Sequence, residues 1–338
     1  YPSLATVPET QTLTNWTVDQ CVDYVRERRD PALPFFLWCS FSKPHPPLDP
    51  PEPYYSMYRD SPIPEPVHGD WATDERVPPV FKRERQGHRH DLLNEEVLRA
   101  ARAAYYGLIT QIDYNIGRLW AALREAGVEE NTLILFASDH GEYLGDHWAG
   151  AKRYFHEPSA HIPMLLRPPP AWEGQTPGVA DDRLASLPDI LPTFVEAAGG
   201  SSDDVEGRSL LPVSGDDAPE RRETLEFIAE MPDGCACLGI TDGRWKYIWY
   251  PEGAVAQLFD LESDPDELTD LVGKGGFEEP CRRMRDRLVE RLRERGGSQL
   301  DERGQLPERP VADIPESHTR AKNGLGLWTE YVDKDVRH

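Results

Sequence analysis

Hydrophobic and polar positions along the chain change period in a way that predicts helices alternating with strands. Apolar residues recur every three or four positions over 16–29 and again from Asn94 to Ala126, as on one face of an amphipathic helix. The runs PFFLWCSF at 34–41 and NTLILFAS at 131–138 have the length and composition of buried strands. Apolar strands joined through a long helix indicate an α/β layer with a mostly parallel sheet.

The segment between the first strand and the long helix lacks such a period. Prolines at 44, 46, 47, 50, 51 and 53 exclude helix and interior strand. The polar, proline-rich stretch 57–93 predicts a long excursion over the surface, and loops of that length are often functional. Its basic residues either meet a carboxylated or sulfated sugar or form a solvated charged loop. These residues are Arg76, Arg83, Arg85, His88, Arg89 and His90.

The C-terminal half predicts a smaller unit built on antiparallel strands. A short strand closed by prolines is expected at 161–170, a helix at 186–199 and a linker at 207–223. Strands follow at 224–230, 237–250 and 256–262, the second folding back at an Asp-Gly turn, and then a charged amphipathic helix at 278–295. We therefore expect a catalytic domain over 1–215 and a small α+β subdomain with a polar tail over 216–338.

Charge narrows the class of partner. The 338 residues carry 37 Lys and Arg against 60 Asp and Glu, a net charge of −23, so nucleic acid and anionic membranes are not expected as partners. An anionic substrate would need a metal or a few placed cations to reverse the field locally. No window approaches the length of an apolar membrane span. The five cysteines show neither a CxxC pair nor a zinc spacing, and they leave the compartment open.

Two sets of side chains carry candidate chemistry. Asp139 and His140 follow the apolar run 131–138, and a carboxylate beside an imidazole at a strand end suits a divalent cation. Lys152 lies beyond a glycine-containing loop that would return its ammonium group to that point. His45, between Pro44 and Pro46, is held stiffly and suits a proton donor or an oxyanion contact. The alternative in each case is an ordinary exposed loop.

Three stretches together resemble the sulfatase family of the alkaline-phosphatase-like superfamily. They are PFFLWCSFSKPHPPLDPPEPYYSMY, then SDHGEYLGDH followed by Lys152, and RWKYIWY with QLFDLESDPDELTDL near the end. Their order and separation are similar to the family pattern over roughly residues 31–272. The resemblance implies an alkaline-phosphatase-like sandwich with a mostly parallel central sheet, and a small C-terminal antiparallel sheet with a helix.

The resemblance also implies roles for individual residues. Asp139 and His140 would be ligands of one divalent cation, calcium, magnesium or manganese. Lys152 would contact the sulfate or the leaving-group oxygen, and His45 would contact the ester oxygen and assist departure of the leaving group. Further candidates for substrate binding are Lys43, His147, His156 and His161; for the three histidines the alternative is a supporting or loop position.

One part of the family pattern does not occur in this sequence. Sulfatases make a formylglycine from the Cys or Ser of a C/S-x-P-x-R motif, and no Cys or Ser here begins one. In the family this motif and two acidic metal ligands precede the block that starts near residue 31. We therefore expect a piece lacking the N-terminal segment with the formylglycine, inactive by itself and either poorly soluble or loosely packed.

The function implied is hydrolysis of a small-molecule or carbohydrate sulfate ester. Two alternatives remain open at this point. One is a phosphonate or phosphate ester hydrolase of the same superfamily, and the other is a non-catalytic binding protein descended from a sulfatase.

Overall fold

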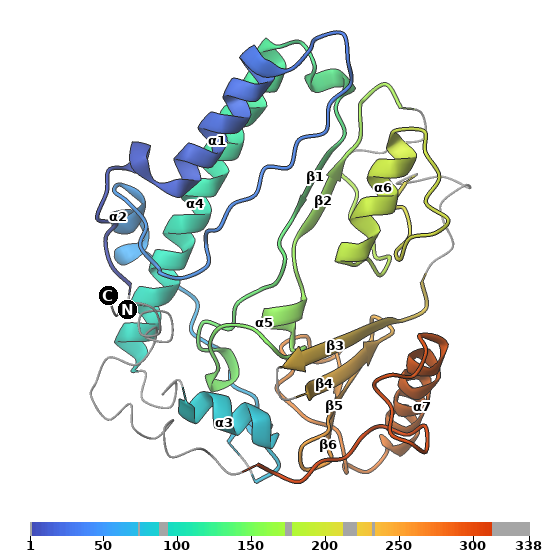
Figure 1. The fold of residues 1–338 in the computed structure, drawn as a ribbon. Coiled ribbons are helices and arrows are strands. Elements are labelled where there is room, and N and C mark those ends of the chain that lie inside the picture. The colour runs from blue at the N-terminus through green and yellow to red at the C-terminus, as the bar shows by residue number, and fades with distance from the viewer. Residues whose placement is uncertain are drawn as a thin grey trace, which may run out of the picture.

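The computed structural model describes residues 2–73, 75–87, 94–172, 178–211, 222–231 and 234–312. In Figure 1 the long helix over 95–125, the strand pair and the helix over 190–197 lie in the upper part, and the four-stranded sheet with its covering helix over 278–294 lies in the lower part. The helices are α1 Leu13–Asp23, α2 Tyr54–Arg59, α3 Pro79–Gly87, α4 Glu95–Glu125, α5 Glu157–Ala160, α6 Ile190–Ala197 and α7 Glu278–Glu294. The strands are β1 Ile134–Ala137, β2 Met164–Arg167, β3 Leu225–Met231, β4 Gly234–Thr241, β5 Trp245–Tyr250 and β6 Val255–Asp260.

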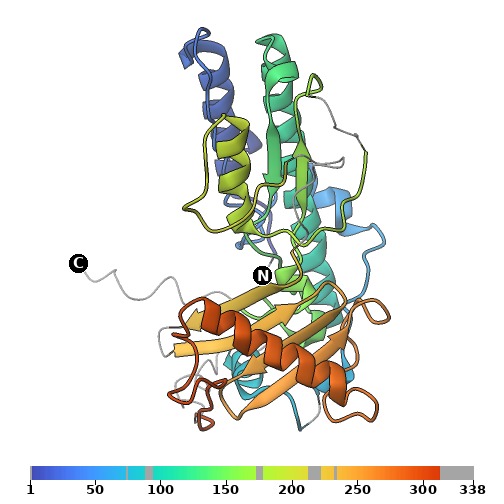
Figure 2. The ribbon, with the colours of Figure 1, turned by 90° about the vertical axis from the view of Figure 1, so that its right-hand side faces the viewer.

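The long helix α4 lies beside α1, as both views in Figures 1 and 2 show. Its first turn is capped by Asn94, whose side chain accepts the Val97 N–H at 2.8 Å. Valines of α1 pack against Ala122 and Leu123 near the end of α4. Both predicted helices are confirmed, although α1 begins at Leu13 and is followed by a separate π-helical turn at Tyr24–Arg28.

The alternation of strands and helix predicted a mostly parallel sheet for the N-terminal part, whereas the strand pair that the structure describes there is antiparallel. β1 pairs with β2 in antiparallel register, Ile134 opposite Arg167 and Ala137 opposite Met164. A parallel pair needs a long crossover connection that returns the chain to the end of the sheet where the first strand began. The connection between β1 and β2 contains only short turns and the four-residue α5. Without a crossover helix, the chain doubles back and pairs antiparallel.

The strand predicted at 34–41 is extended but pairs with no strand in the described part of the chain. Burial alternates along it. Phe35 and Leu37 pack toward the α1–α4 cluster, whereas Phe36 and Trp38 are 62% and 66% exposed. Side-chain burial over 34–41 therefore alternates as in a strand, although the segment has no strand hydrogen bonds to a described neighbour. On β2, Leu165 is similarly exposed, at 64%.

The C-terminal sheet confirms the antiparallel unit, with strand order β3-β4-β5-β6. Helix α7 covers one face, as Figure 2 shows, where Met284 and Leu288 meet alternate residues of the strands, among them Tyr247. Ile248 and Tyr250 point to the opposite face and pack into a second core cluster. Both faces are buried, which explains why β5 reads as a nearly continuous apolar run.

The surface excursion predicted at 57–93 is also wrong. Trp71 and Phe81 are each 1% exposed, and with Val77 and Val80 they pack against the C-terminal sheet. The segment includes helix α3, and residues 88–93 lie outside the described part. The apolar positions are spaced irregularly among prolines, so no period reveals them. Their partners are also far away in the sequence.

The basic residues of this segment make structural contacts. Arg83 forms a two-pronged ion pair with Glu252, at 2.5 and 2.6 Å. Arg85 donates to the carbonyls of Ala72 and His147, and Arg76 donates to the carbonyl of Val272 at 2.8 Å. His88, Arg89 and His90 lie outside the described residues. These contacts tie the segment to its neighbours, and nothing in them points to a sugar.

The predicted boundary at 215/216 falls within residues 212–221, which are outside the described ranges, so the division into two domains stays a prediction. The core cluster around Trp71 contains side chains from both sides of it, including Tyr143 and Phe259. Among the described helices, none combines the length and the apolar composition that crossing a membrane requires.

Candidate active site

Asp139 and His140 lie just beyond β1, where the chain leaves the strand pair. The His140 Nδ1–H donates to the carbonyl of Gly141 at 2.7 Å, which fixes the tautomer and leaves a lone pair on Nε2. That Nε2 lies 3.4 Å from Asp139 Oδ2. The Asp139 side chain is 82% exposed, so an imidazole lone pair and a carboxylate converge on a point open to solvent.

His45 and Lys152 meet beside this pair. The His45 Nδ1–H donates to the carbonyl of Pro46 at 3.0 Å, and the Lys152 ammonium donates to His45 Nε2 at 2.9 Å. The rings of His45 and His140 are 6.4 Å apart, edge to face. The four residues predicted from two distant sequence blocks therefore form one cluster.

A strained loop carries Lys152 to this position. Leu144, His147, Trp148 and Ala151 have φ values of 44°, 52°, 60° and 57°, a left-handed region that costs non-glycine residues on the order of 1–3 kcal/mol each. Two backbone hydrogen bonds close the loop, from Tyr143 N–H to the Ala151 carbonyl and from Gly145 N–H to that of Ala149. Strain of this kind persists only where the surroundings over-determine it.

Segment 67–69 supplies part of that surrounding. The His147 N–H donates to the carbonyl of Val67 at 2.7 Å, and the Val67 N–H donates to Asp146 Oδ1 at 3.0 Å. The ring of His68 stacks on Trp148 with 3.8 Å between centroids and 4° between planes. The loop is thus clamped on its outer side.

The other predicted substrate-binding residues are placed differently from one another. Lys43 forms an ion pair with Asp49 and donates to the carbonyl of Pro47 at 2.6 Å, so it braces the loop of His45. His161 is exposed, with its side chain 75% accessible. His147 and His156 are 0% exposed, so they do not line an open pocket and instead take the supporting position that was the alternative for them.

His147 and His156 are buried because they pack into the aromatic cluster around Trp71. The ring of His156 stacks on Trp71 at 4.6 Å, its Nδ1 bonds the Tyr143 hydroxyl and its Nε2 bonds Gln257. Burial lowers the pKa of His147 to about 4 and the pKa of His156 well below its usual value. Both rings are therefore neutral core groups at pH 7.

Glu142 is a titratable group beside the site that the sequence did not single out. Burial raises the pKa of its carboxyl to about 7, opposed by backbone N–H groups and by the charge of Lys152. Its position in SDHGE, shortly after the candidate metal ligands, is the feature of the sequence that could have identified it.

The donor set fits a divalent cation in part. A carboxylate and an imidazole nitrogen suit magnesium, calcium or manganese. In the described ranges, no group of three or more His, Cys, Asp or Glu side chains is arranged to hold a metal ion. Asp139 and His140 therefore supply two ligands, and a hard cation needs more oxygen donors.

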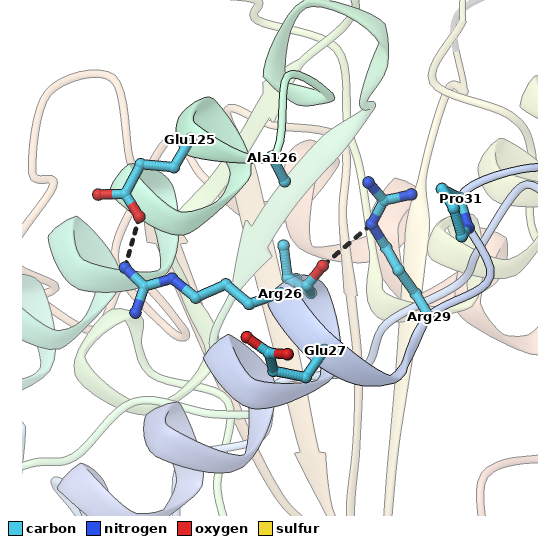
Figure 3. Close-up of a pocket in the computed structure, with 7 residues that line it drawn as sticks. Arg26, Glu27, Arg29, Pro31, Glu125 and Ala126 are labelled. Atoms are coloured by element: carbon cyan, nitrogen blue, oxygen red, sulfur yellow. Dashed lines mark hydrogen bonds and ion pairs between the residues drawn. The ribbon is translucent and has the colours of Figure 1, made fainter.

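A hollow of about 350 Å³ lies away from this cluster, between the end of the first helix and the C-terminus of α4 (Figure 3). Arg26 and Glu125 pair across it at 2.5 Å, and Arg29 donates to the Val25 carbonyl. None of the predicted site residues lines it. We assign no chemistry to it.

Comparison with known proteins gives a consistent family. A family model described as Sulfatase matches residues 3–201, and one described as N-sulphoglucosamine sulphohydrolase, C-terminal, matches residues 145–294. An arylsulfatase of Clostridium perfringens is 37% identical over 306 residues, 89% of this chain. A protein of Trinickia caryophylli named as a multifunctional alkaline phosphatase superfamily protein, PehA, is 31% identical over 80% of this chain.

Solved structures agree on the fold. The phosphonate monoester hydrolase of Agrobacterium radiobacter superposes with a TM-score of 0.73 at 28% identity, covering 91% of this chain and 66% of that one. This chain spans 62% of the length of the arylsulfatase and 57% of the length of PehA. The matched family models and the identity to the arylsulfatase show that the chain belongs to the sulfatase family of the alkaline-phosphatase-like superfamily.

Proposed function

We propose that the complete protein hydrolyses sulfate monoesters at the cluster formed by Asp139, His140, His45 and Lys152. The observation that supports this most directly is the contact between Lys152 and His45, 107 positions apart, beside the Asp139–His140 pair. A sulfate ester carries negative charge on its oxygens, and cleavage adds more on the leaving alkoxide. Groups that concentrate positive charge at that point stabilise the transition state.

Asp139 and His140 are the proposed ligands of one divalent cation. The family generally uses such a cation together with a formylglycine, and when bound the cation would add positive charge beside the sulfate oxygens. Its identity among calcium, magnesium and manganese, the formylglycine and the remaining ligands are proposals for the complete protein.

Lys152 and His45 act as a unit in this proposal. In the observed tautomer His45 presents a lone pair at Nε2, and the Lys152 ammonium donates to it. In this proposal the Lys152 ammonium keeps its proton and adds positive charge beside the leaving oxygen, while its hydrogen bond holds the His45 ring toward the ester oxygen. Lys43 holds the loop through Asp49, and His161 is the remaining exposed candidate for a substrate contact.

The test is steady-state kinetics of the complete protein with an aryl sulfate. His45→Ala and Lys152→Ala should each lower kcat by on the order of 10²-fold, as for transition-state contacts. Lys82→Ala, which removes an exposed lysine of α3, is the matched control and should leave kcat unchanged. Unchanged kcat in both site variants would refute the assignment.

A phosphonate ester substrate is the second candidate. It is favoured by the 28% identity to a phosphonate monoester hydrolase and by the multifunctional description of PehA. Comparing kcat/KM for an aryl sulfate and an aryl phosphonate monoester on the same preparation decides which ester the complete protein prefers.

A further inference from the structure

A buried ionic cluster lies outside the candidate site, where the C-terminal sheet meets α5. Lys246 of β5 is the cation at its centre, with a side chain only 2% exposed. It lies 2.8 Å from Glu267, whose side chain is 0% exposed, and it also pairs with Glu157 at the start of α5. Placing charges in the interior costs several kcal/mol per ion, and apolar side chains often fill such a place at no loss of stability.

The cluster is costly in two further ways. Glu267 has a left-handed backbone, with φ of 53°, although it is not glycine. Burial raises the pKa of its carboxyl to about 7, against the attraction of Lys246. Packing alone does not require a second carboxylate beside one lysine.

Glu267 and Glu157 both hold α5 in place. Glu267 Oε2 accepts the backbone N–H of Glu157 at 2.6 Å, at the first residue of the helix. The other oxygen of Glu157 lies 2.6 Å from His161 Nδ1, at the end of the same helix. The two carboxylates therefore fix both ends of the helix to the C-terminal sheet.

Helix α5 in turn fixes the backbone directly after the candidate metal ligands. The N–H groups of Gly141 and Glu142 donate to the carbonyls of Ser159 and Pro158, each at 2.8 Å. The approach is close, because a Cβ built on Gly141 would lie 2.1 Å from the Pro158 oxygen. Movement of α5 therefore displaces residue 141 or breaks these hydrogen bonds.

His161 belongs to the same unit because it follows α5 directly and its ring contacts Glu157. The β1–β2 ladder ends at the pair Ala137 and Met164. Beyond this pair, the N–H groups of Gly141 and Glu142 donate to carbonyls of α5. The cluster therefore holds the segment that carries His161 beside the segment that follows His140.

We propose that Lys246, Glu267 and Glu157 are positioning residues of the active site. They hold α5 against the C-terminal sheet, and through α5 they set the backbone of residues 140–142 and the ring of His161. Their role in catalysis rests on the proposed function, whereas their role in ordering the strand ends does not. The two are tested separately.

The first test measures amide hydrogen exchange in the full chain by mass spectrometry. Lys246→Met removes the central charge at similar length and should speed exchange in peptides covering 139–145 and 157–161 by about tenfold or more. Exchange in β4 and α7 should stay within about twofold. The matched control is Arg244→Met, which breaks a pair with Asp260 in the same sheet, at 3.0 Å, and should leave 139–145 unchanged.

Should Lys246→Met unfold the whole chain, exchange rises everywhere, and Glu157→Gln takes its place. That side chain is 25% exposed, so the milder variant keeps the sheet intact while weakening the contacts to Lys246 and His161. Faster exchange confined to 139–145 and 157–161 supports the proposal. Exchange there equal to wild type in a folded variant overturns it.

The second test is kinetic and uses the complete protein with an aryl sulfate. Glu157→Gln should lower kcat by about tenfold or more with KM changed less than about threefold, since the reacting groups lose alignment. A wild-type protein without sulfatase turnover would refute the proposed function alone, and the exchange result would stand. Altered exchange with unchanged kcat would overturn the catalytic part of the proposal.

Discussion

Replacing His147 by asparagine should make the stability of the protein less sensitive to mild acid. The imidazole is 0% exposed, its Nδ1 accepts the Gly69 N–H at 3.1 Å, and its Nε2 has no partner among the described residues. Burial, together with the electrostatic effects of His68, Lys246 and Arg85, lowers its pKa to about 4. The folded protein therefore keeps this ring neutral.

The sign of the effect follows from the two states. In the unfolded chain the histidine takes up a proton below about pH 6.5, whereas in the folded chain it does so only below about pH 4. The stabilising contribution of the neutral buried ring is complete above pH 6.5 and is lost as pH falls between these values. At pH 5 the loss amounts to about 2 kcal/mol.

Asparagine is a suitable replacement for this position. Its side-chain oxygen can accept the Gly69 N–H, and it tolerates the φ of 52° better than most residues. At pH 7.5 the variant is the less stable protein because the ring contacts with Trp71 and His156 are lost. Between pH 7.5 and pH 5 the difference in unfolding free energy between wild type and variant should narrow by about 2 kcal/mol, since only wild type has the buried histidine that titrates.

Urea unfolding followed by tryptophan fluorescence at both pH values measures the difference. His161→Asn is the control. The pKa of His161 is raised by its hydrogen bond to Glu157, so that ring contributes stability below about pH 6.5 that is lost as pH rises, and its difference should widen in acid. A His147→Asn difference that stays constant within about 0.5 kcal/mol would refute the reasoning about burial.

Two further predictions concern packing. Trp71→Phe should lower the free energy of unfolding by about 2–4 kcal/mol, measured by urea titration, because the buried Glu267 carbonyl loses the indole N–H that donates at 2.8 Å and ring volume is lost. A cost below about 1 kcal/mol would contradict this. Leu165→Lys should reduce self-association in light scattering, since it places a charge on an apolar side chain that is 64% exposed on a strand. Equal association of variant and wild type would show that this face is not involved.

Local patterns predicted the helices well because the spacing of apolar residues along a helix shows which of its faces is buried. The apolar residues of α4 recur with the period of a helix, and Asn94 marks where that helix starts. The structure places the helix and its N-terminal cap as expected. Segment 34–41 has the correct period of burial, yet a ladder requires a partner strand that the segment itself does not specify. The same limit explains β1 and β2, whose direction depends on how the loop between them folds.

The aromatic cluster shows a different limit. Trp71 and Phe81 lie in a proline-rich stretch without a period, and their partners come from residues about 70 to 190 positions further along the chain. Composition alone suggested a polar surface loop. The contacts that bury these rings depend on the C-terminal sheet, which is built later in the sequence.

Part of the candidate site could be predicted from the sequence, and part could not. Asp139 and His140 stood out at a strand end, His45 between prolines and Lys152 beyond a glycine-containing loop, all within the resemblance to sulfatases, and the structure brings them together. Lys246 and Glu267 also lie in stretches that carry the resemblance, but nothing in the sequence connects them with each other or with Glu157. Glu157 and Glu267 are 110 positions apart, and each reads as an ordinary charged residue.

The geometry at the end of β1 gives a physical reason to expect a cation there. His140 donates from Nδ1 to a carbonyl, so its Nε2 lone pair faces the Asp139 carboxylate at 3.4 Å with no proton between them in the neutral tautomer. Two electron-rich groups at that separation repel each other. A shared cation turns the contact into an attraction. Because the carboxylate is open to solvent and the Gly141 carbonyl holds the ring orientation, a metal ion can bind both groups with little rearrangement. Under the proposed function, Lys152 and His45 would lie beside such a cation and could contact the sulfate ester.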